Sequence, residues 1–270
     1  MILRKLYKLL EKTGPRSIFV RACTEYALRL FHLLRLGQEP KQRFAIYMQG
    51  RSGSSFFCDL IDQHPEIRCN TELLNNKCIN PYSFLRNISC YYGKKYPVWG
   101  FKFKCYQMHT GNIPSVEYFL NYLSGQKYKI ICLTRKNSLK VSLSMWIAYK
   151  RGEQYHNTGE LGERKKVTVT TDEVVGVIER SEDIHREMQE SLKGIDALEL
   201  VYEDDLEDPD KALESCQKVF DLLGVEPIEV QSKFKKVSTG RLSDDLENAE
   251  EIYEFIKNSK YAHFLEGVSL

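Results

Sequence analysis

The sequence contains no run of about 18 or more apolar residues, so it has no segment with the length and hydropathy of a membrane-spanning helix. Its N-terminus lacks the apolar core and the small-residue cleavage site of a signal peptide. Its eight cysteines form no C-x-x-C pair, and no spacing of cysteine and histidine matches a zinc site. These absences predict a cytoplasmic protein with free thiols and without a bound metal.

The charge is nearly balanced but unevenly distributed. A net charge of only +2 gives no reason to expect nucleic acid as a partner. Residues 1–43, however, hold ten Lys and Arg against three Glu, with apolar residues such as Leu3, Leu6 and Leu10 between them. We favour a basic N-terminal helical segment that packs on the rest of the protein with a solvated basic face. The alternative is an amphipathic helix in peripheral contact with an anionic membrane surface.

Short apolar runs alternate with segments of helical periodicity along the rest of the chain. The expected strands span residues 44–49, 67–71, 98–104, 129–134 and 198–202. The first expected helix begins after Gly53, and the others span residues 138–150, 171–193, 210–223 and 244–257. Thr171 or Asp172 is expected to cap the long helix at 171–193.

This alternation predicts an α/β fold with one domain and a mostly parallel central sheet flanked by helices. The predicted domain covers residues 44–270, and residues 1–43 precede it as the basic helical segment. Residues 152–170 form the longest stretch without a periodic pattern, and we expect a mobile loop there.

The segment after the first strand has the composition of an anion-binding turn. Gly53 is expected to let the backbone approach a ligand closely, and the first N–H groups of the following helix have no partner within the helix. Ser52, Ser54 and Ser55 add hydroxyl donors, and Arg51 adds a guanidinium group that can donate two parallel hydrogen bonds to an oxyanion. The alternative is an ordinary strand-to-helix turn with a serine cap.

This turn resembles a P-loop without matching the Walker A pattern. It lacks the Lys-Ser/Thr ending that nucleoside triphosphatases place on the β- and γ-phosphates and on Mg²⁺. A P-loop-type nucleotide kinase is therefore the alternative enzyme class, and a non-catalytic relative at a membrane surface is the third hypothesis.

A second polar cluster follows the strand at 129–134. Arg135 ends that strand, Asn137 follows it, and Ser142 and Ser144 lie on the next helix. An arginine at the end of a strand and a helical serine can converge on one phosphate at the carboxyl edge of a sheet. We prefer Ser144 to Ser142, and either serine has the alternative of bonding its own helix backbone.

Taken together, these segments resemble the PAPS-dependent sulfotransferases, whose co-substrate is 3′-phosphoadenosine 5′-phosphosulfate (PAPS). The resemblance is carried by Gln49–Ser55 with His64-Pro65, by Ile130–Arg135 with the serines that follow, and by Leu200–Pro209. It covers roughly residues 44–266. The spacing from Arg135 to Ser144 is similar to that of a bacterial branch that modifies carbohydrates and lipids.

The resemblance implies roles for particular residues. Glu72 is the expected general base, and His109 is the fallback, since a cytosolic branch uses a histidine. Lys102 and Arg51 are expected to stabilise the leaving phosphate. The implied ligands of PAPS and of its product, 3′-phosphoadenosine 5′-phosphate (PAP), are Arg51, Ser52, Gly53, Ser54, Ser55, Phe56, Arg135, Ser144, Lys236 and Arg241.

The implied reaction is transfer of a sulfuryl group by in-line displacement to a hydroxyl of a small-molecule acceptor. A sugar, a glycolipid or another hydroxyl compound would serve as that acceptor. For Glu72 and for the serines of the anion-binding turn, the alternative to a role in the reaction is a structural one. A carboxylate or hydroxyl at a helix start also caps backbone N–H groups.

Overall fold

The computed structural model describes residues 18–152, 165–231 and 240–270. A five-stranded parallel sheet lies at the centre, in the order β2-β3-β1-β4-β5. The strands are β1 (Gln42–Met48), β2 (Ile67–Glu72), β3 (Val98–Phe103), β4 (Tyr128–Thr134) and β5 (Ala197–Val201). The chain is a single-domain α/β protein, as predicted from its alternating pattern, and all five expected strands are present.

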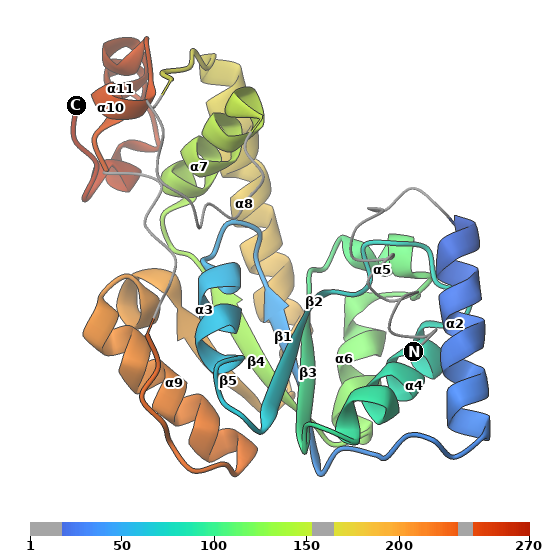
Figure 1. Ribbon diagram of the computed structural model, residues 1–270. Helices are drawn as coiled ribbons and strands as arrows, with labels where there is room; N and C mark the ends of the chain where they lie inside the picture. The colour runs from blue at the N-terminus through green and yellow to red at the C-terminus, as the bar shows by residue number, and fades with distance from the viewer. Residues whose placement is uncertain (1–17, 153–164, 232–239) are drawn as a thin grey trace.

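Helices cover both faces of the sheet (Figure 1). One face is packed by α2 (Ile18–Leu33), α4 (Pro81–Gly93) and α6 (Val116–Gly125), and the other by α3 (Ser54–Ile61) and α9 (Pro209–Leu223). The remaining elements are α5 (Gln107–Gly111), α7 (Ser138–Arg151), α8 (Thr171–Ser191), the π-helical turn η2 (Tyr202–Leu206), α10 (Leu242–Asp245), α11 (Ala249–Lys257) and the 3₁₀ turn η3 (Ala262–Leu265).

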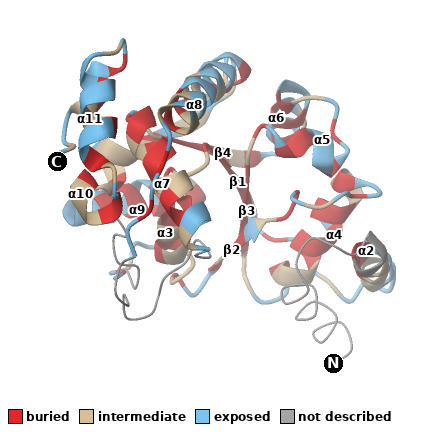
Figure 2. Cartoon of the chain, turned by 90° about the horizontal axis from the view of Figure 1, so that it is seen from above, coloured by how far each residue is buried: buried red, intermediate tan, exposed pale blue. Residues whose placement is uncertain are grey.

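The hydrophobic core is divided by the sheet into two layers, and α7, α8, α10 and α11 form a third cluster beside them. Figure 2 shows the buried strands in line through the centre, with exposed residues on the outer sides of the helices. Strand β3 is buried along its whole length, because helices cover both of its faces. The fold therefore holds the carboxyl ends of β1, β3 and β4 in fixed positions.

Two details differ from the prediction. The segment 244–257 is not one helix, because Leu246 adopts an extended conformation between α10 and α11. Its neighbours use their backbone groups to bridge to Val167: Val167 N–H donates to Asp245 O, and Glu247 N–H donates to Val167 O. This bridge replaces the helical hydrogen bonds at that point.

The cap of α8 is Thr170, and not Thr171 or Asp172. The Thr170 hydroxyl accepts from the N–H of Glu173, and the Glu173 carboxylate accepts from the N–H of Thr170. This reciprocal capping box satisfies two donors at the helix start, which places the cap one residue earlier than expected. Most of the expected loop at 152–170 lies outside the described residues.

Candidate functional site

The turn between β1 and α3 has the conformation expected of an anion-binding loop. Arg51 and Gly53 both have positive φ, at 63° and 76°. Gly53 is the N-cap of α3 and provides no side-chain cap, so the N–H groups of the first helical turn remain available to a ligand. Ser52 is fully buried, and its hydroxyl donates to Gln49 O at 2.7 Å, which ties the turn together.

The structure gives a packing reason for a glycine at position 53. A Cβ atom at this position would lie 2.6 Å from two ring carbons of Tyr202, which comes from the far end of β5. The missing side chain therefore makes room for the Tyr202 ring and permits the positive φ.

Arg51 and Ser144 meet across the space between β1 and α7. The Arg51 guanidinium donates to the Ser144 hydroxyl through Nε at 2.9 Å and through Nη2 at 2.5 Å. Ser144 therefore faces the loop. Ser142 lies on the other side of α7, fully buried, where its hydroxyl donates to Val174 O of α8 at 3.0 Å. The structure thus brings Ser144, and not Ser142, to the candidate site.

Arg135 is held at the end of β4 by contacts from three directions. Its Nη1 donates to Arg51 O at 3.0 Å, and its guanidinium carbon lies 4.6 Å from the centre of the Tyr202 ring. Its Nε lies 3.5 Å from a carboxylate oxygen of Glu203. The backbone N–H of Arg135 donates to the side-chain oxygen of Gln49 at 3.1 Å. Arg135 is therefore fixed against the loop, at the crevice between β1 and β4.

Glu203 organises the turn that follows Arg135. Its two carboxylate oxygens accept from the backbone N–H groups of Lys136 at 2.9 Å and of Asn137 at 3.1 Å. Asn137 in turn caps α7 by accepting from the N–H of Lys140. The observed contacts of Tyr202 and Glu203 are structural. The sequence could not indicate that both act on Arg135, because their proximity comes from the pairing of β4 with β5.

Gln49 is a residue whose role the sequence did not reveal. It is buried immediately after β1, and its amide nitrogen donates to the hydroxyl of Ser181 on α8. Together with its bond to the Arg135 backbone, this joins the ends of β1 and β4 to α8. A buried amide directly after an apolar strand is the signal that could have marked it, because such a group needs partners.

A second polar group lies at the ends of β2 and β3. Lys102 is almost completely buried and donates to the hydroxyl of Ser55 at 2.9 Å. Lys102 also pairs in register with Glu72 across the two strands. This places one buried ammonium group directly beside the first turn of α3, where an anion at the loop would sit.

Glu72 is ionised and strongly tied to its neighbours. Its carboxylate accepts from Lys104 Nζ at 2.9 Å and from the Gln107 amide at 2.6 Å. Burial favours the neutral acid, but the charge and hydrogen bond of Lys104 and the charge of Lys102 outweigh it and hold the pKa of Glu72 below its usual value. The same ion pair, acting against burial, raises the pKa of Lys104.

The remaining predicted residues lie farther from this arrangement or outside the described ranges. His109 is exposed on α5, whereas His64 is buried and contacts Glu226 O and Glu66 N, as expected for a residue that orders a turn. Phe56 is partly buried against the core layer under α3. Arg241 is exposed at the start of α10, with a backbone bridge to Ser269. Lys236 falls within 232–239, outside the described residues.

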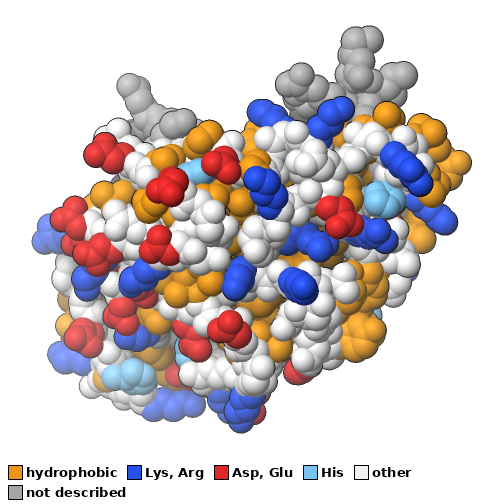
Figure 3. All heavy atoms as spheres, turned by 90° about the horizontal axis from the view of Figure 1, so that it is seen from below, with side chains coloured by type: hydrophobic (Ala, Val, Ile, Leu, Met, Phe, Trp, Pro, Cys, Tyr) orange, Lys and Arg blue, Asp and Glu red, His pale blue; other side chains and the backbone are white. Residues whose placement is uncertain are grey.

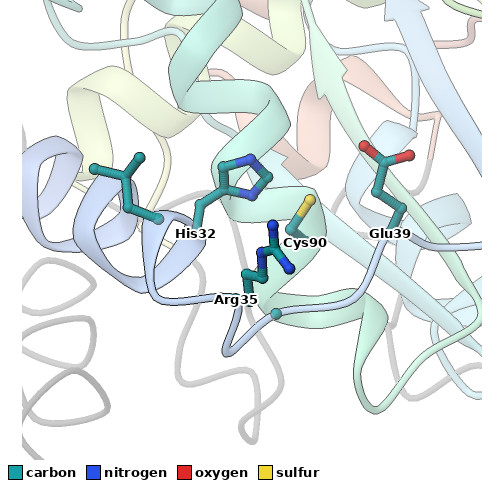
Figure 4. A pocket seen from close by; sticks show the side chains of 6 residues that line it. His32, Arg35, Glu39 and Cys90 are labelled. Atoms are coloured by element: carbon teal, nitrogen blue, oxygen red, sulfur yellow. The ribbon is translucent and has the colours of Figure 1, made fainter.

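Two pockets lie in the described part of the chain, and neither is lined by a residue of the turn between β1 and α3. One, of about 430 Å³, is lined by residues at the end of α2 and on α4 (Figure 4), and the other lies at α10 and α11. Among residues 18–152, 165–231 and 240–270, no group of three or more His, Cys, Asp or Glu is arranged to hold a metal ion. No helix within the described ranges is long and apolar enough to cross a membrane.

Comparison with known proteins gives matches among solved structures, and the one described here is limited. No family model matches the chain, and no curated protein matches it. Among solved structures, mouse sulfotransferase SULT7A1 complexed with PAP is similar, with 16% sequence identity and a TM-score of 0.42. The match covers 74% of this chain and 65% of the mouse chain, so this chain spans less than two thirds of that protein's length. We draw no functional conclusion from a similarity of this size.

Proposed function

We propose that this chain is a sulfotransferase that transfers a sulfuryl group from PAPS to a hydroxyl group. The observation that carries the proposal is the meeting of Arg51, Arg135 and Ser144 beside the uncapped N-terminus of α3. These residues come from the two sequence motifs that resemble the donor-binding elements of PAPS-dependent sulfotransferases. Two guanidinium groups, a hydroxyl and free helix N–H groups suit a ligand that carries two separate anionic groups.

In the proposed arrangement, the 5′-phosphosulfate lies on the loop and the 3′-phosphate lies toward Arg135 and Ser144. The first-turn N–H groups of α3 and the Ser54 and Ser55 hydroxyls bind the 5′ end. The contact between Arg51 and Ser144 is replaced or bridged when the nucleotide enters, because both groups then bond to it. Lys236 and Arg241 remain proposed ligands of the 3′-phosphate.

The proposed reaction breaks one bond and forms one bond at sulfur. The acceptor oxygen forms a new O–S bond while the bond from sulfur to the bridging phosphate oxygen breaks. The acceptor proton passes to a base, and the products are a sulfate ester and PAP. Lys102, beside Ser55, is the group best situated to stabilise the negative charge on the leaving phosphate.

Glu72 is the proposed base. Its lowered pKa means that the carboxylate is ready to accept a proton at neutral pH, although it is a weak base. A weak base suffices if the proton leaves late, because the acceptor hydroxyl becomes acidic only as the O–S bond forms. Lys104 and Gln107 hold the carboxylate in one orientation.

The acceptor is proposed to be a carbohydrate or a lipid-linked hydroxyl compound, as in the bacterial branch that the motifs resemble. The test is release of PAP from PAPS in the presence of a panel of sugars and glycolipids. We expect acceptor-dependent PAP release that falls at least tenfold in Arg135→Ala and in Glu72→Gln. For Glu72→Gln, PAP binding should be retained.

Two results would contradict the proposal. One is magnesium-dependent turnover of ATP that is lost in Arg51→Ala, which would indicate a nucleotide kinase or hydrolase. The other is PAP release that is unchanged in Arg135→Ala, which would place the donor elsewhere.

A further inference from the structure

Helix α2 presents a stripe of large apolar side chains to solvent. Tyr26, Leu30 and Leu33 recur at helical spacing on one side of α2, and Leu34 and Leu36 follow just after its end. Their exposed fractions run from 47% to 72%. They make up five of the twelve large hydrophobic residues that are exposed in the described part of the chain, and they fall within eleven consecutive positions. Scattered exposed leucines need no explanation, but a contiguous group does.

The stripe is not what holds α2 to the protein. The opposite side of the helix packs on α4, where Leu28 is buried and the Arg21 guanidinium lies 3.6 Å from the centre of the Phe84 ring. Arg21 also donates to Glu25 and to Leu73 O. Folding of α2 therefore rests on a separate, fully formed contact surface, and the exposed stripe remains available for a partner.

The exposed charges on α2 itself and directly after its end are positive. Glu25 is the one carboxylate in the sequence of α2, and it is buried in its pair with Arg21. Arg29 and Arg35 are exposed beside the leucines. Figure 3 shows hydrophobic side chains next to Lys, Arg and His side chains on the side of the molecule where α2 lies.

The hollow at the end of α2 adds further polar groups. His32 and Arg35 line it together with Cys90 of α4 and Glu39 (Figure 4). Glu39 is the carboxylate at this hollow, and it lies 3.6 Å from Arg86. The end of α2 therefore combines exposed leucines with cationic groups.

These features fit one kind of partner, and we propose that α2 docks on the surface of an anionic lipid bilayer. Its apolar stripe would enter the interface, and Arg29 and Arg35 would contact the lipid headgroups. A two-fold pairing centred on the stripe would bring Arg29 and Arg35 of both copies into one interface, where like charges cost energy. The segment 1–17, which precedes α2 in the sequence, lies outside the described residues and contains five Lys and Arg against one Glu. The proposal does not depend on the sulfotransferase activity.

The test is sedimentation of the full chain with vesicles of phosphatidylcholine alone and of phosphatidylcholine mixed with phosphatidylserine. We expect binding to the mixed vesicles only, weakened by salt. Leu30→Glu and Leu33→Glu should each lower the partition coefficient about tenfold, because each removes one apolar side chain from the interface. Arg29→Gln and Arg35→Gln should each lower it about fivefold.

The matched control is Leu213→Glu on α9, an exposed leucine remote in sequence that undergoes the same chemical change. We expect it to bind vesicles like the wild type. Without lipid, Leu33→Glu should have the same melting temperature as the control, since its side chain is free in solution.

Several outcomes would overturn the proposal. Equal binding of the wild type to the two vesicle types would contradict it, and so would a loss of binding in Leu213→Glu equal to that in Leu33→Glu. A lipid-free melting temperature lowered in Leu33→Glu alone would show that residues 1–17 cover the stripe. A dimer in solution that Leu33→Glu dissociates would show that a second copy covers it.

Discussion

The contact between Gly53 and Tyr202 allows a prediction with a magnitude. In Gly53→Ala the new Cβ meets the Tyr202 ring at 2.6 Å, and the backbone must keep a φ of 76°. The left-handed conformation costs an L-residue about 1–2 kcal/mol. Forcing the ring aside adds about 1–3 kcal/mol. We therefore expect the free energy of unfolding to fall by about 2–5 kcal/mol, the sum of these two costs.

Gly224→Ala is the matched control, because it separates the two costs. Gly224 has a φ of 70° at the end of α9, and no described atom lies within 4 Å of an added Cβ. Only the backbone cost of about 1–2 kcal/mol should appear there. Urea unfolding followed by circular dichroism measures both variants.

A double-variant cycle with Tyr202→Ala tests the cause directly. Without the ring, Gly53→Ala should cost no more than Gly224→Ala, which gives a coupling energy of about 1–3 kcal/mol. Equal costs for Gly53→Ala and Gly224→Ala in the wild-type background would refute the reasoning, because the Tyr202 ring would then not constrain the loop.

Three further predictions concern the polar groups of the site. Ser144→Ala should weaken PAP binding in calorimetry, whereas Ser142→Ala should leave PAP affinity unchanged and lower stability by about 1 kcal/mol, since its hydroxyl bonds a backbone carbonyl of α8. Folding lowers the pKa of Glu72, so the ionised Glu72 stabilises the fold above about pH 4.3, and this stabilisation is lost as the pH falls through the folded pKa. The free energy of unfolding of Glu72→Gln should therefore fall less steeply with pH below that value. Identical acid-unfolding curves for the wild type and Glu72→Gln would contradict the lowered pKa. Glu203→Gln should lower stability by about 1–3 kcal/mol and also weaken PAP binding, because it loosens Arg135; lost stability with unchanged PAP affinity would limit Glu203 to a structural role.

The order of the strands and of the helices that follow β1 and β4 could be predicted, because each depends on nearby sequence, whereas α4, α5 and α6 were not predicted. An apolar run, a glycine and serines followed by helical spacing indicate strand, turn and α3 without any knowledge of distant residues. The same holds for the strand that ends at Arg135. The break at Leu246 could not be predicted, because it depends on a backbone bridge to Val167, which lies almost eighty positions earlier.

The choice between Ser142 and Ser144 shows the same limit within the site. Two positions on a helix differ by about 200°, so the two serines must face opposite sides of α7. Their partners are Val174 O and Arg51, and neither is near in sequence. The spacing from Arg135 predicts that both serines lie on the helix but not which side of the helix faces the turn. The packing of α7 against α8 decides which serine faces the turn.

The burial of Lys102 and the pairing of Glu72 with Lys104 depend on strand register in the same way. Strand alternation would put Lys102 and Lys104 on one face of the expected strand 98–104, but the observed strand ends at Phe103. The structure gives the two lysines different partners, the Ser55 hydroxyl and the Glu72 carboxylate. Glu72 lies opposite Lys102 in the register of β2 against β3 but forms its ion pair with Lys104, which follows the strand, and no local pattern encodes this difference.

The measurement that tests the central claim most directly is calorimetric titration of the chain with PAP, beside ATP and 5′-AMP, on the wild type and on Arg135→Ala. The account predicts that PAP binds far more tightly than the other two nucleotides and that Arg135→Ala removes this preference. At a hundredfold excess over its dissociation constant, PAP should also stabilise the folded wild type by about 2.7 kcal/mol. Equal affinity for PAP and ATP, or a preference for PAP that survives in Arg135→Ala, would contradict the account.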